Sequence, residues 1–342
     1  RERAESIGII GAGPAGMAAA EELRKKGYQV HVYDRYDRVG GLLIYGIPGF
    51  KLEKPIVMRR AELLQAGGIH FHLNCEIGGT EGPSFTELRE RHAAVLVATG
   101  VYKPRALQAP GVGMPGIVAA LDYLTASNRK GLGDEVPDFD SGALNAHGRD
   151  VVVVGGGDTA MDCVRTAVRQ GASSVSCLYR RDRDNMPGSM REVANAEEEG
   201  VDFVWLSAPE AFLGGDSVES VRVQRMRLGA PDATGRREPV PGSSTDRPGD
   251  LVIAALGFDP EDLVTLFDEP TLPVSRWGTL KIDWDNMMTE LPGVFAAGDI
   301  VRGASLVVWG VRDGRDAAAG IHQFIQSGAA RDGAATPLKL AS

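Results

Sequence analysis

The chain has 342 residues, enough for two domains, and its 44 glycines and mixed charges are typical of a globular α/β protein. A formal net charge of −9 does not indicate the basic surface that binding to nucleic acid requires. No apolar run is long enough to span a membrane and no signal peptide is recognisable, so we expect a cytoplasmic protein that binds neither nucleic acid nor a membrane. The chain begins without Met, almost at its first glycine motif, and we therefore expect a further N-terminal part in the natural protein.

The first nucleotide-binding motif lies close to the N-terminus. An apolar strand is predicted over residues 6–10, followed by a G-x-G-x-x-G motif at 11–16 and a helix over residues 14–26. Glycines at these positions allow a tight turn and a close approach of a pyrophosphate, which the helix N-terminus attracts. A second strand, 29–33, ends at Asp34, where a ribose hydroxyl needs an acceptor. Because a carboxylate repels a 2′-phosphate, this site is predicted to bind FAD or NAD rather than NADP.

Three further segments favour FAD at this first site. Residues 39–43 form a glycine-containing loop after the acid, and residues 95–100 form an apolar strand that ends in a small turn. Residues 293–299 form a buried strand that ends in Gly-Asp, suited to a ribityl chain, and the following helix, 305–326, points its positive end toward a reduced flavin. The predicted FAD-binding residues are Gly11, Gly13, Pro14, Ala15, Gly16, Asp34, Arg35, Gly41, Leu42, Thr99, Gly100, Gly298, Asp299, Ser305, Leu306 and Val307.

The second motif follows the β-branched run 151–154 and has Ala160 at the position of the third glycine. The next predicted strand, 174–179, ends in Arg180 and Arg181 instead of an acid. Guanidinium groups at this place can grip a 2′-phosphate, so the second site is predicted to bind NADPH. A further buried strand, 251–258, is expected to reach the nucleotide. The predicted NADPH-binding residues are Gly155, Gly157, Asp158, Thr159, Arg180, Arg181, Arg183 and Gly257.

The order of these segments predicts that one domain interrupts the other. We expect a discontinuous FAD-binding domain, 1–110 and 288–342, and an inserted NADPH-binding domain, 111–287, because both crossings contain proline and glycine. The fold class is therefore α/β, with two Rossmann-like, three-layer dinucleotide-binding domains. Residues 201–240 alternate short apolar and polar runs and are expected to form a small antiparallel excursion within the NADPH domain.

The remaining candidate residues do not indicate a second kind of chemistry. Cys75, Cys163 and Cys177 are widely spaced without a C-x-x-C pair, which excludes a redox disulfide of the thioredoxin reductase type and a metal site built from local cysteines. We expect all three to be buried thiols. The acid pairs Asp158/Asp162 and Asp313/Asp316 are interpreted as capping or ion-pairing groups. No catalytic side chain is predicted, because the cofactors carry the reaction.

Several longer segments resemble one known family closely. Residues 40–52, 155–165 and 179–189, together with 297–303, 306–309 and 312–315, are similar to the flavin-containing part of the small (β) subunit of bacterial NADPH-dependent glutamate synthase. The resemblance covers essentially the whole chain and implies the pyridine nucleotide-disulfide oxidoreductase architecture, with FAD at the first site and NADPH at the second. It also implies an N-terminal cysteine-rich domain with iron–sulfur clusters, which the present sequence does not contain, and a large (α) subunit as partner.

The chemistry expected from this resemblance is hydride transfer from NADPH to FAD. In the family, electrons then pass through the clusters to the large subunit, which forms L-glutamate from glutamine and 2-oxoglutarate. Sister proteins of the same architecture include dihydropyrimidine dehydrogenase and NADH-dependent ferredoxin:NADP reductases, so the acceptor stays open. One alternative is a self-contained NADPH oxidoreductase or diaphorase that uses ferredoxin or a quinone. Another is a non-catalytic flavin-binding assembly module, against which the retained Arg180–Arg181 pair argues.

Overall fold

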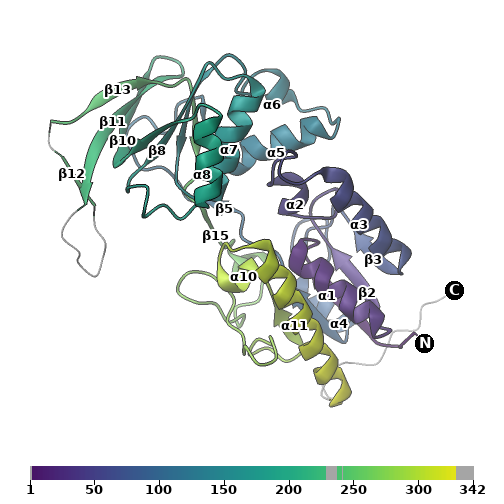
Figure 1. Cartoon of the computed structure of the whole chain (residues 1–342). Coiled ribbons are helices and arrows are strands. Elements are labelled where there is room, and N and C mark those ends of the chain that lie inside the picture. The colour runs from purple at the N-terminus through teal and green to yellow at the C-terminus, as the bar shows by residue number, and fades with distance from the viewer. Residues whose placement is uncertain (1, 229–236, 241, 329–342) are drawn as a thin grey trace. The chain divides into compact units, whose positions relative to one another are not determined.

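The computed structural model describes residues 2–228, 237–240 and 242–328, and within this part of the chain no helix is both long and apolar enough to cross a membrane. The chain forms two compact units (Figure 1). Unit 1 consists of Arg1–Ile44, Leu52–Lys103 and Phe258–Ser342, and unit 2 consists of Tyr45–Lys51 and Pro104–Gly257. One unit thus interrupts the other, as the order of the motifs predicts.

The division between the units differs from the expected boundaries in two places. Residues 258–287, expected in the inserted domain, belong to unit 1, because Leu263, Phe267 and Leu280 pack in the same buried cluster as Val294 of unit 1. The short segment Tyr45–Lys51 belongs to unit 2, although the chain on both sides of it belongs to unit 1. The strands β5 (Lys103–Pro104) and β15 (Phe258–Asp259), where the chain passes from one unit to the other, pair as a two-stranded sheet.

Unit 1 is built on a five-stranded parallel sheet in the order β16-β4-β1-β2-β3. Its strands are β1 (Ser6–Ile10), β2 (Gln29–Tyr33), β3 (Ile69–His72), β4 (Ala94–Val97) and β16 (Val294–Ala296). The central strands β1 and β4 are almost fully buried, which accounts for their continuous apolar sequence. The carboxyl ends of β1, β2 and β4 lie at one edge, where the first glycine motif and Asp34 follow.

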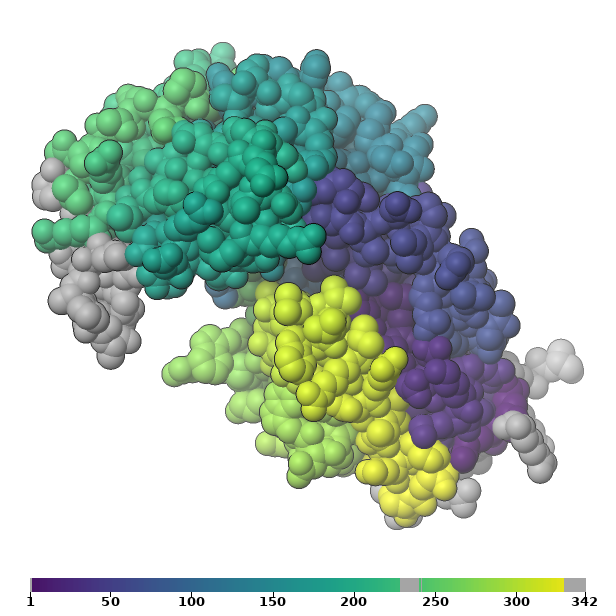
Figure 2. Space-filling model, in the orientation of Figure 1, coloured from purple at the N-terminus to yellow at the C-terminus, as the bar shows by residue number. Residues whose placement is uncertain are grey.

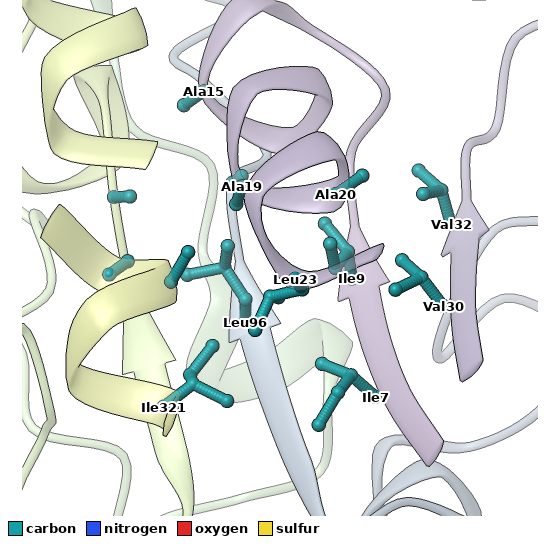
Figure 3. Packing of buried hydrophobic residues seen from close by; sticks show 14 of the residues in the cluster. Ile7, Ile9, Ala15, Ala19, Ala20, Leu23, Val30, Val32, Leu96 and Ile321 are labelled. Carbon is teal, nitrogen blue, oxygen red and sulfur yellow. The ribbon is translucent and has the colours of Figure 1, made fainter. Parts of the chain in front are cut away.

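Two helices, α1 (Pro14–Lys25) and α11 (Val307–Gln326), pack against each other and against this sheet. Figure 3 shows Ala19 and Leu23 of α1 among the side chains of the strands, with Ile321 of α11 next to Leu96. Small alanines on α1 let the helix approach the sheet closely. The other helices of unit 1 are α2 (Leu42–Tyr45), of which the last residue belongs to unit 2, α3 (Lys54–Ala66), α4 (Phe85–Arg91), α9 (Leu263–Leu266) and α10 (Asp299–Arg302).

Unit 2 repeats this plan with a five-stranded parallel sheet in the order β6-β14-β7-β8-β9. Its strands are β6 (Ile117–Ala119), β7 (Asp150–Val154), β8 (Ser174–Tyr179), β9 (Asp202–Trp205) and β14 (Leu251–Ala254). Its helices are α5 (Ala120–Gly131), α6 (Pro137–Asp140), α7 (Asp158–Gln170) and α8 (Met190–Glu198).

An antiparallel sheet covers part of unit 2 and confirms the expected excursion only in part. It contains β10 (Ser207–Gly214), β11 (Val218–Leu228), β12 (Arg237–Pro239) and β13 (Thr245–Pro248). Phe212 and Val221 from this sheet pack with Val152 and Leu178 of the parallel sheet. The prediction is wrong for β9, which pairs in parallel with β8, because the strand after α8 completes the Rossmann-like sheet first.

Candidate dinucleotide-binding sites

The first glycine motif forms a tight turn between β1 and α1. Gly11 has φ +108°, and a Cβ added to it would collide with the carbonyl oxygen of Ala98 at the end of β4. A Cβ on Gly16 would collide with the carbonyl oxygen of Gly11. By contrast, a Cβ on Gly13 would meet no atom within 4 Å. Two of the glycines are therefore required by the turn itself, whereas Gly13 borders open space, as the approach of a pyrophosphate to the backbone demands.

Asp34 at the end of β2 holds this turn in place. Its carboxylate accepts a hydrogen bond of 2.6 Å from the amide of Ala12 and another of 2.8 Å from the amide of Tyr36. The side chain is buried, and burial raises the pKa of Asp34, against the two amides that lower it. A carboxylate offers about four acceptor positions. Capacity therefore remains for a ribose hydroxyl beside the two amides.

The loops after β4 and after Asp34 approach the same turn. The amide of Gly40 donates to the carbonyl of Ala12 at 2.9 Å, and a Cβ on Gly41 would lie 3.0 Å from Cα of Gly13. Thr99 follows β4, and its hydroxyl is buried without a hydrogen-bond partner in the described part of the chain. An orphaned buried hydroxyl is costly unless a ligand satisfies it. The next residue, Gly100, has φ +74°, and a Cβ on it would lie 3.0 Å from the ring of Tyr102.

The C-terminal segment of unit 1 adds a third side to this site. Gly298 has φ +81°, and a Cβ on it would lie 3.0 Å from Cβ of Ala15 in α1. Asp299 accepts a hydrogen bond of 2.8 Å from the Ser305 hydroxyl, and burial raises its pKa. The residues that follow, Leu306 to Trp309, are exposed at the beginning of α11, the yellow helix on the face shown in Figure 2.

Arg35 takes part in a cluster that sequence reasoning did not foresee. Its guanidinium forms an ion pair of 2.8 Å with Glu261 and lies 5.2 Å from the ring centroids of Tyr36 and Tyr102. Glu261 belongs to the segment that was expected in the other domain, so its position near Asp34 could not be inferred. Tyr36, three residues after the end of β2, and Tyr102, five residues after the end of β4, are the features that could have indicated an aromatic cluster around Arg35.

The second glycine motif has the same layout as the first. Gly155 has φ +154°, and a Cβ on it would collide with the carbonyl oxygen of Ala255 after β14. A Cβ on Gly157 would again meet nothing within 4 Å, and no side chain caps the N-terminus of α7 at this residue. Ala160 is fully buried, so the third position here accepts a methyl group. The amides of the first turn of α7 are thus available to an anion.

A loop after β8 folds back onto this motif. The amide of Gly188 donates to the carbonyl of Gly156 at 2.9 Å, and the amide of Ser189 donates to the Asp158 carboxylate at 3.0 Å. The hydroxyl of Tyr179 donates to the carbonyl of Asn185 at 2.9 Å, and the Tyr179 ring occupies the space that a Cβ on Gly156 would need. Sequence reasoning missed these contacts, although the Pro-Gly turn before Ser189 indicates a fold in the chain.

The arginines at the end of β8 differ in their partners. Within the residues that the structure describes, the guanidinium groups of Arg180 and Arg181 form no ion pair or hydrogen bond, whereas Arg183 pairs with Glu197 at 2.8 Å. Two unpaired cations therefore stand at the place where unit 1 has the carboxylate of Asp34. Gly257, at the end of unit 2, has φ +92° and accepts a hydrogen bond from the amide of Arg105. Thr159 is half-buried in the first turn of α7.

The predictions about charged residues and cysteines are confirmed for Asp162, Asp313 and Asp316 and for two of the three cysteines. Asp158 differs, because its carboxylate accepts from the Ser189 amide and forms no ion pair with another described residue. Asp162 pairs with Lys51 at 2.7 Å, and Asp313 pairs with Arg302 at 2.6 Å, so both acids serve in ion pairs. Cys163 and Cys177 are buried free thiols, but Cys75 is only half-buried because it follows the edge strand β3. Among the described residues, no group of His, Cys, Asp and Glu could hold a metal ion.

Comparison with known proteins agrees with this arrangement. Residues 5–314 match the family model described as pyridine nucleotide-disulphide oxidoreductase. The chain is 64% identical over 96% of its length to a glutamate synthase [NADPH] small chain from Azospirillum brasilense, and covers 68% of that relative. It is 65% identical over 95% of its length to a putative glutamate synthase [NADPH] small chain from Cereibacter sphaeroides, of which it covers 78%. A solved structure of Mycobacterium tuberculosis FprA in complex with NADPH has the same fold, with a TM-score of 0.80, 19% identity, and coverage of 98% of this chain and 88% of that one.

Proposed function

The chain belongs to the pyridine nucleotide-disulphide oxidoreductase family, among the glutamate synthase [NADPH] small chains, and on this basis we propose that it oxidises NADPH by means of a bound FAD. We place FAD at the glycine motif of unit 1 and NADPH at that of unit 2. When bound, the two cofactors would supply the redox chemistry, a hydride passing from NADPH, which would leave as NADP⁺, to FAD, which would take up one proton as well to give FADH₂.

The observation that carries the assignment of the two nucleotides is the opposite charge at the ends of two equivalent strands. In unit 1, β2 ends at the buried carboxylate of Asp34, which suits a ribose with a free 2′-hydroxyl. In unit 2, the equivalent strand β8 ends at Arg180 and Arg181, whose guanidinium groups have no partner among the described residues. A 2′-phosphate beside these guanidinium groups would accept charge-assisted hydrogen bonds from them.

The residues of unit 1 fit FAD in their donor and acceptor chemistry. The open space over Gly13 and the amides of the first turn of α1 would receive the pyrophosphate. The hydroxyl of Thr99 would gain a partner, and the carboxylate of Asp299, already oriented by Ser305, would accept from a ribityl hydroxyl. The role of this chain in the reaction is to bind and orient the two cofactors, and no side chain is needed as an acid or a base.

We further propose that the chain works as the small subunit of a glutamate synthase in the cytoplasm, with the large subunit as partner. The relatives in Azospirillum brasilense and Cereibacter sphaeroides, named as small chains of that enzyme, support this role. The three cysteines of the sequence are separate free thiols, so iron–sulfur clusters that pass electrons to the large subunit would be held outside these 342 residues. The large subunit would then use the electrons to form L-glutamate from glutamine and 2-oxoglutarate.

Replacement of Arg180 and of Arg181 by alanine tests whether the glycine motif of unit 2 binds NADPH. In the FAD-loaded protein, Arg180→Ala and Arg181→Ala should each weaken NADPH binding by about tenfold or more, because a charge-assisted hydrogen bond contributes about 1.5–3 kcal/mol. Binding of NADH should change little. Arg222→Ala, which removes an exposed ion pair with Asp246, is the control. Equal losses for NADPH and NADH would contradict the assignment.

A further inference from the structure

The loop that follows β8 carries the two arginines proposed to bind a 2′-phosphate, and we call residues 180–189 the arginine loop. Arg180 and Arg181 stand at its beginning, and it ends at Ser189, the residue before α8. The whole loop belongs to unit 2, as does the second glycine motif. The contacts that hold the loop therefore determine where the two cations stand relative to this motif.

Two contacts hold the middle of the arginine loop within unit 2. The hydroxyl of Tyr179, the last residue of β8, donates to the carbonyl of Asn185 at 2.9 Å, and the next residue, Met186, is buried in the core of the unit. The amide of Gly188 donates to the carbonyl of Gly156 at 2.9 Å. A Cβ on Gly188 would lie 3.0 Å from that carbonyl oxygen, so a glycine suits this close approach to the motif.

The third contact of the loop is made by a side chain. The Asp158 carboxylate, at the first position of α7, accepts a hydrogen bond of 3.0 Å from the amide of Ser189. The dipole of a helix favours an acid in its first turn, but a bound pyrophosphate would use the same positive end and would be repelled by a carboxylate. Contact with the nucleotide therefore does not account for an acid at this position, whereas the contact with Ser189 does.

The glycine motif of unit 1 is held to its second strand in a different way. The carboxylate of Asp34, directly after β2, accepts from the amide of Ala12 in the glycine turn at 2.6 Å. The acid that would bind a ribose therefore also ties the end of its strand to the turn. The position that corresponds to Asp158 is Pro14, whose side chain accepts no hydrogen bond.

Unit 2 cannot use the same tie, because β8 ends in cations. A guanidinium group donates hydrogen bonds and accepts none, so neither Arg180 nor Arg181 can receive a backbone amide of the turn. The carboxylate stands instead on the helix side of the turn, at Asp158, and reaches the arginine loop at Ser189. Each unit thus has one carboxylate between its glycine motif and the segment after its second strand. In unit 2 this arrangement leaves the end of β8 available for groups that bind a phosphate.

Resting on the function proposed above, we propose that Asp158 is a positioning residue that determines specificity. It does not bind NADPH itself but holds the arginine loop so that Arg180 and Arg181 meet the 2′-phosphate. A loop already held in its binding conformation loses less conformational freedom when the nucleotide binds. Without the contact to Ser189, only a fraction of the molecules would present the arginines correctly, and the dissociation constant of the phosphorylated nucleotide would rise accordingly.

The discrimination between NADP⁺ and NAD⁺, which bind without reducing the flavin, tests this role in the FAD-loaded protein. In Asp158→Ala, the ratio of the NAD⁺ to the NADP⁺ dissociation constant should fall about fivefold. In Asp158→Asn, which loses the charge but keeps an oxygen that can accept from Ser189, the ratio should stay within about twofold of the wild type. Both nucleotides contain the pyrophosphate, so an effect of the charge on that group cancels in the ratio. The control Asp246→Ala, which removes an exposed acid of the same unit, should leave it unchanged.

A second comparison shows whether Asp158 acts through the arginines. In Arg180→Ala/Arg181→Ala, the loop has lost the guanidinium groups that it would position. Adding Asp158→Ala to this variant should therefore change the ratio by less than about twofold. A further fall of about fivefold would show that Asp158 affects the nucleotide without the arginines and would overturn the proposal.

Hydrogen exchange in the nucleotide-free protein gives a readout that does not depend on binding. Exchange over residues 182–189 should become faster in Asp158→Ala and should stay near the wild-type rate in Asp158→Asn. An unchanged ratio or unchanged exchange in Asp158→Ala would overturn the positioning role, and so would an equal loss of discrimination in both variants. A wild-type protein that binds NADP⁺ no better than NAD⁺ would instead overturn the assignment of NADPH to unit 2, on which the proposal rests.

Discussion

Each glycine motif contains glycines that the fold requires and a glycine that borders the space proposed for the nucleotide. Single substitutions distinguish these two roles. Gly155 has φ +154° and faces the carbonyl oxygen of Ala255, so its role lies in the fold. Gly157 has φ −92°, which any residue can adopt, and borders open space. An added methyl group at Gly157 therefore costs the fold nothing, but it occupies the space proposed for the pyrophosphate.

We predict that Gly157→Ala keeps the wild-type stability and weakens NADPH binding by about tenfold or more, since a misplaced charge-assisted contact costs about 1.5–3 kcal/mol. Gly155→Ala should instead lower the free energy of unfolding by about 1–3 kcal/mol, through strain at a positive φ. Urea unfolding and NADPH titration of both variants check this. Tight NADPH binding by Gly157→Ala would show that the pyrophosphate lies elsewhere.

At the scale of residues, the sequence predicts the glycine turns correctly but not the side chains that contact them. The spacing of Gly11, Gly13 and Gly16 and the acid at Asp34 predict a strand–turn–helix that the structure contains. The pair between Arg35 and Glu261 could not be predicted, because it joins residues that are far apart in the sequence. The same is true of Ser189, whose amide reaches Asp158 only after the loop has folded back.

At the scale of elements, β2 and β3 carry a cluster of histidines on one face of the unit 1 sheet. His31 stacks on His70 and His72, with ring centroids 4.9 and 5.3 Å apart. His92 accepts or donates hydrogen bonds with Ser6 at 2.7 Å and Tyr33 at 3.0 Å. Burial lowers the pKa of His92 to about 3 and that of His31 to about 4, with the neighbouring histidines and Arg91 acting in the same direction.

These lowered pKa values predict that unit 1 loses stability in mild acid. The unfolded chain binds protons on His92 below about pH 6.5, whereas the folded chain does not until about pH 3. The stability is therefore present above pH 6.5 and decreases as the pH falls, by about 2 kcal/mol for His92 between pH 7 and pH 5. His92→Asn should reduce this dependence, whereas His147→Gln, outside the cluster, should not. Equal urea unfolding of the wild type at both pH values would contradict the account.

Helices and strands are predicted correctly where a hydrophobic pattern or a glycine motif in the local sequence determines them. The run 151–154 and the helix to Gln170 are observed as β7 and α7. The antiparallel strands β10 and β11 were expected only as a region, because their register depends on packing against Val152 and Leu178 of the parallel sheet. Tertiary contacts of this kind leave no periodic pattern in the sequence of one strand.

At the scale of the whole molecule, each unit has its own buried core. The clusters around Leu96 and Phe85 consist of unit 1 residues, and those around Val153 and Phe212 consist of unit 2 residues. We therefore predict that each cofactor protects its own unit. NADP⁺ at 100 times its dissociation constant should stabilise unit 2 by about 2.7 kcal/mol, and FAD should do the same for unit 1.

Hydrogen exchange measures this protection separately for the amides of β7 and β1. Protection of β1 by NADP⁺ in FAD-free protein, equal to that of β7, would show that the units unfold together.

The boundary between the units is also where sequence reasoning was least successful. Proline and glycine placed the second crossing near residue 288, but the packing of Phe267 and Leu280 moves it to Gly257. The segment Tyr45–Lys51, which belongs to unit 2, contains Gly46, Pro48 and Gly49, a sign of a boundary that was not used.

The central claim, electron entry from NADPH into a flavin bound by this chain, is tested most directly by anaerobic stopped-flow mixing. The FAD-loaded chain is mixed with NADPH and, separately, with NADH, and the flavin absorbance is followed. We predict rapid bleaching at low NADPH concentrations, with a dissociation constant for NADH about tenfold or more higher because of Arg180 and Arg181. Flavin that stays oxidised at saturating NADPH, or that NADH reduces equally well at the same low concentration, would contradict the account.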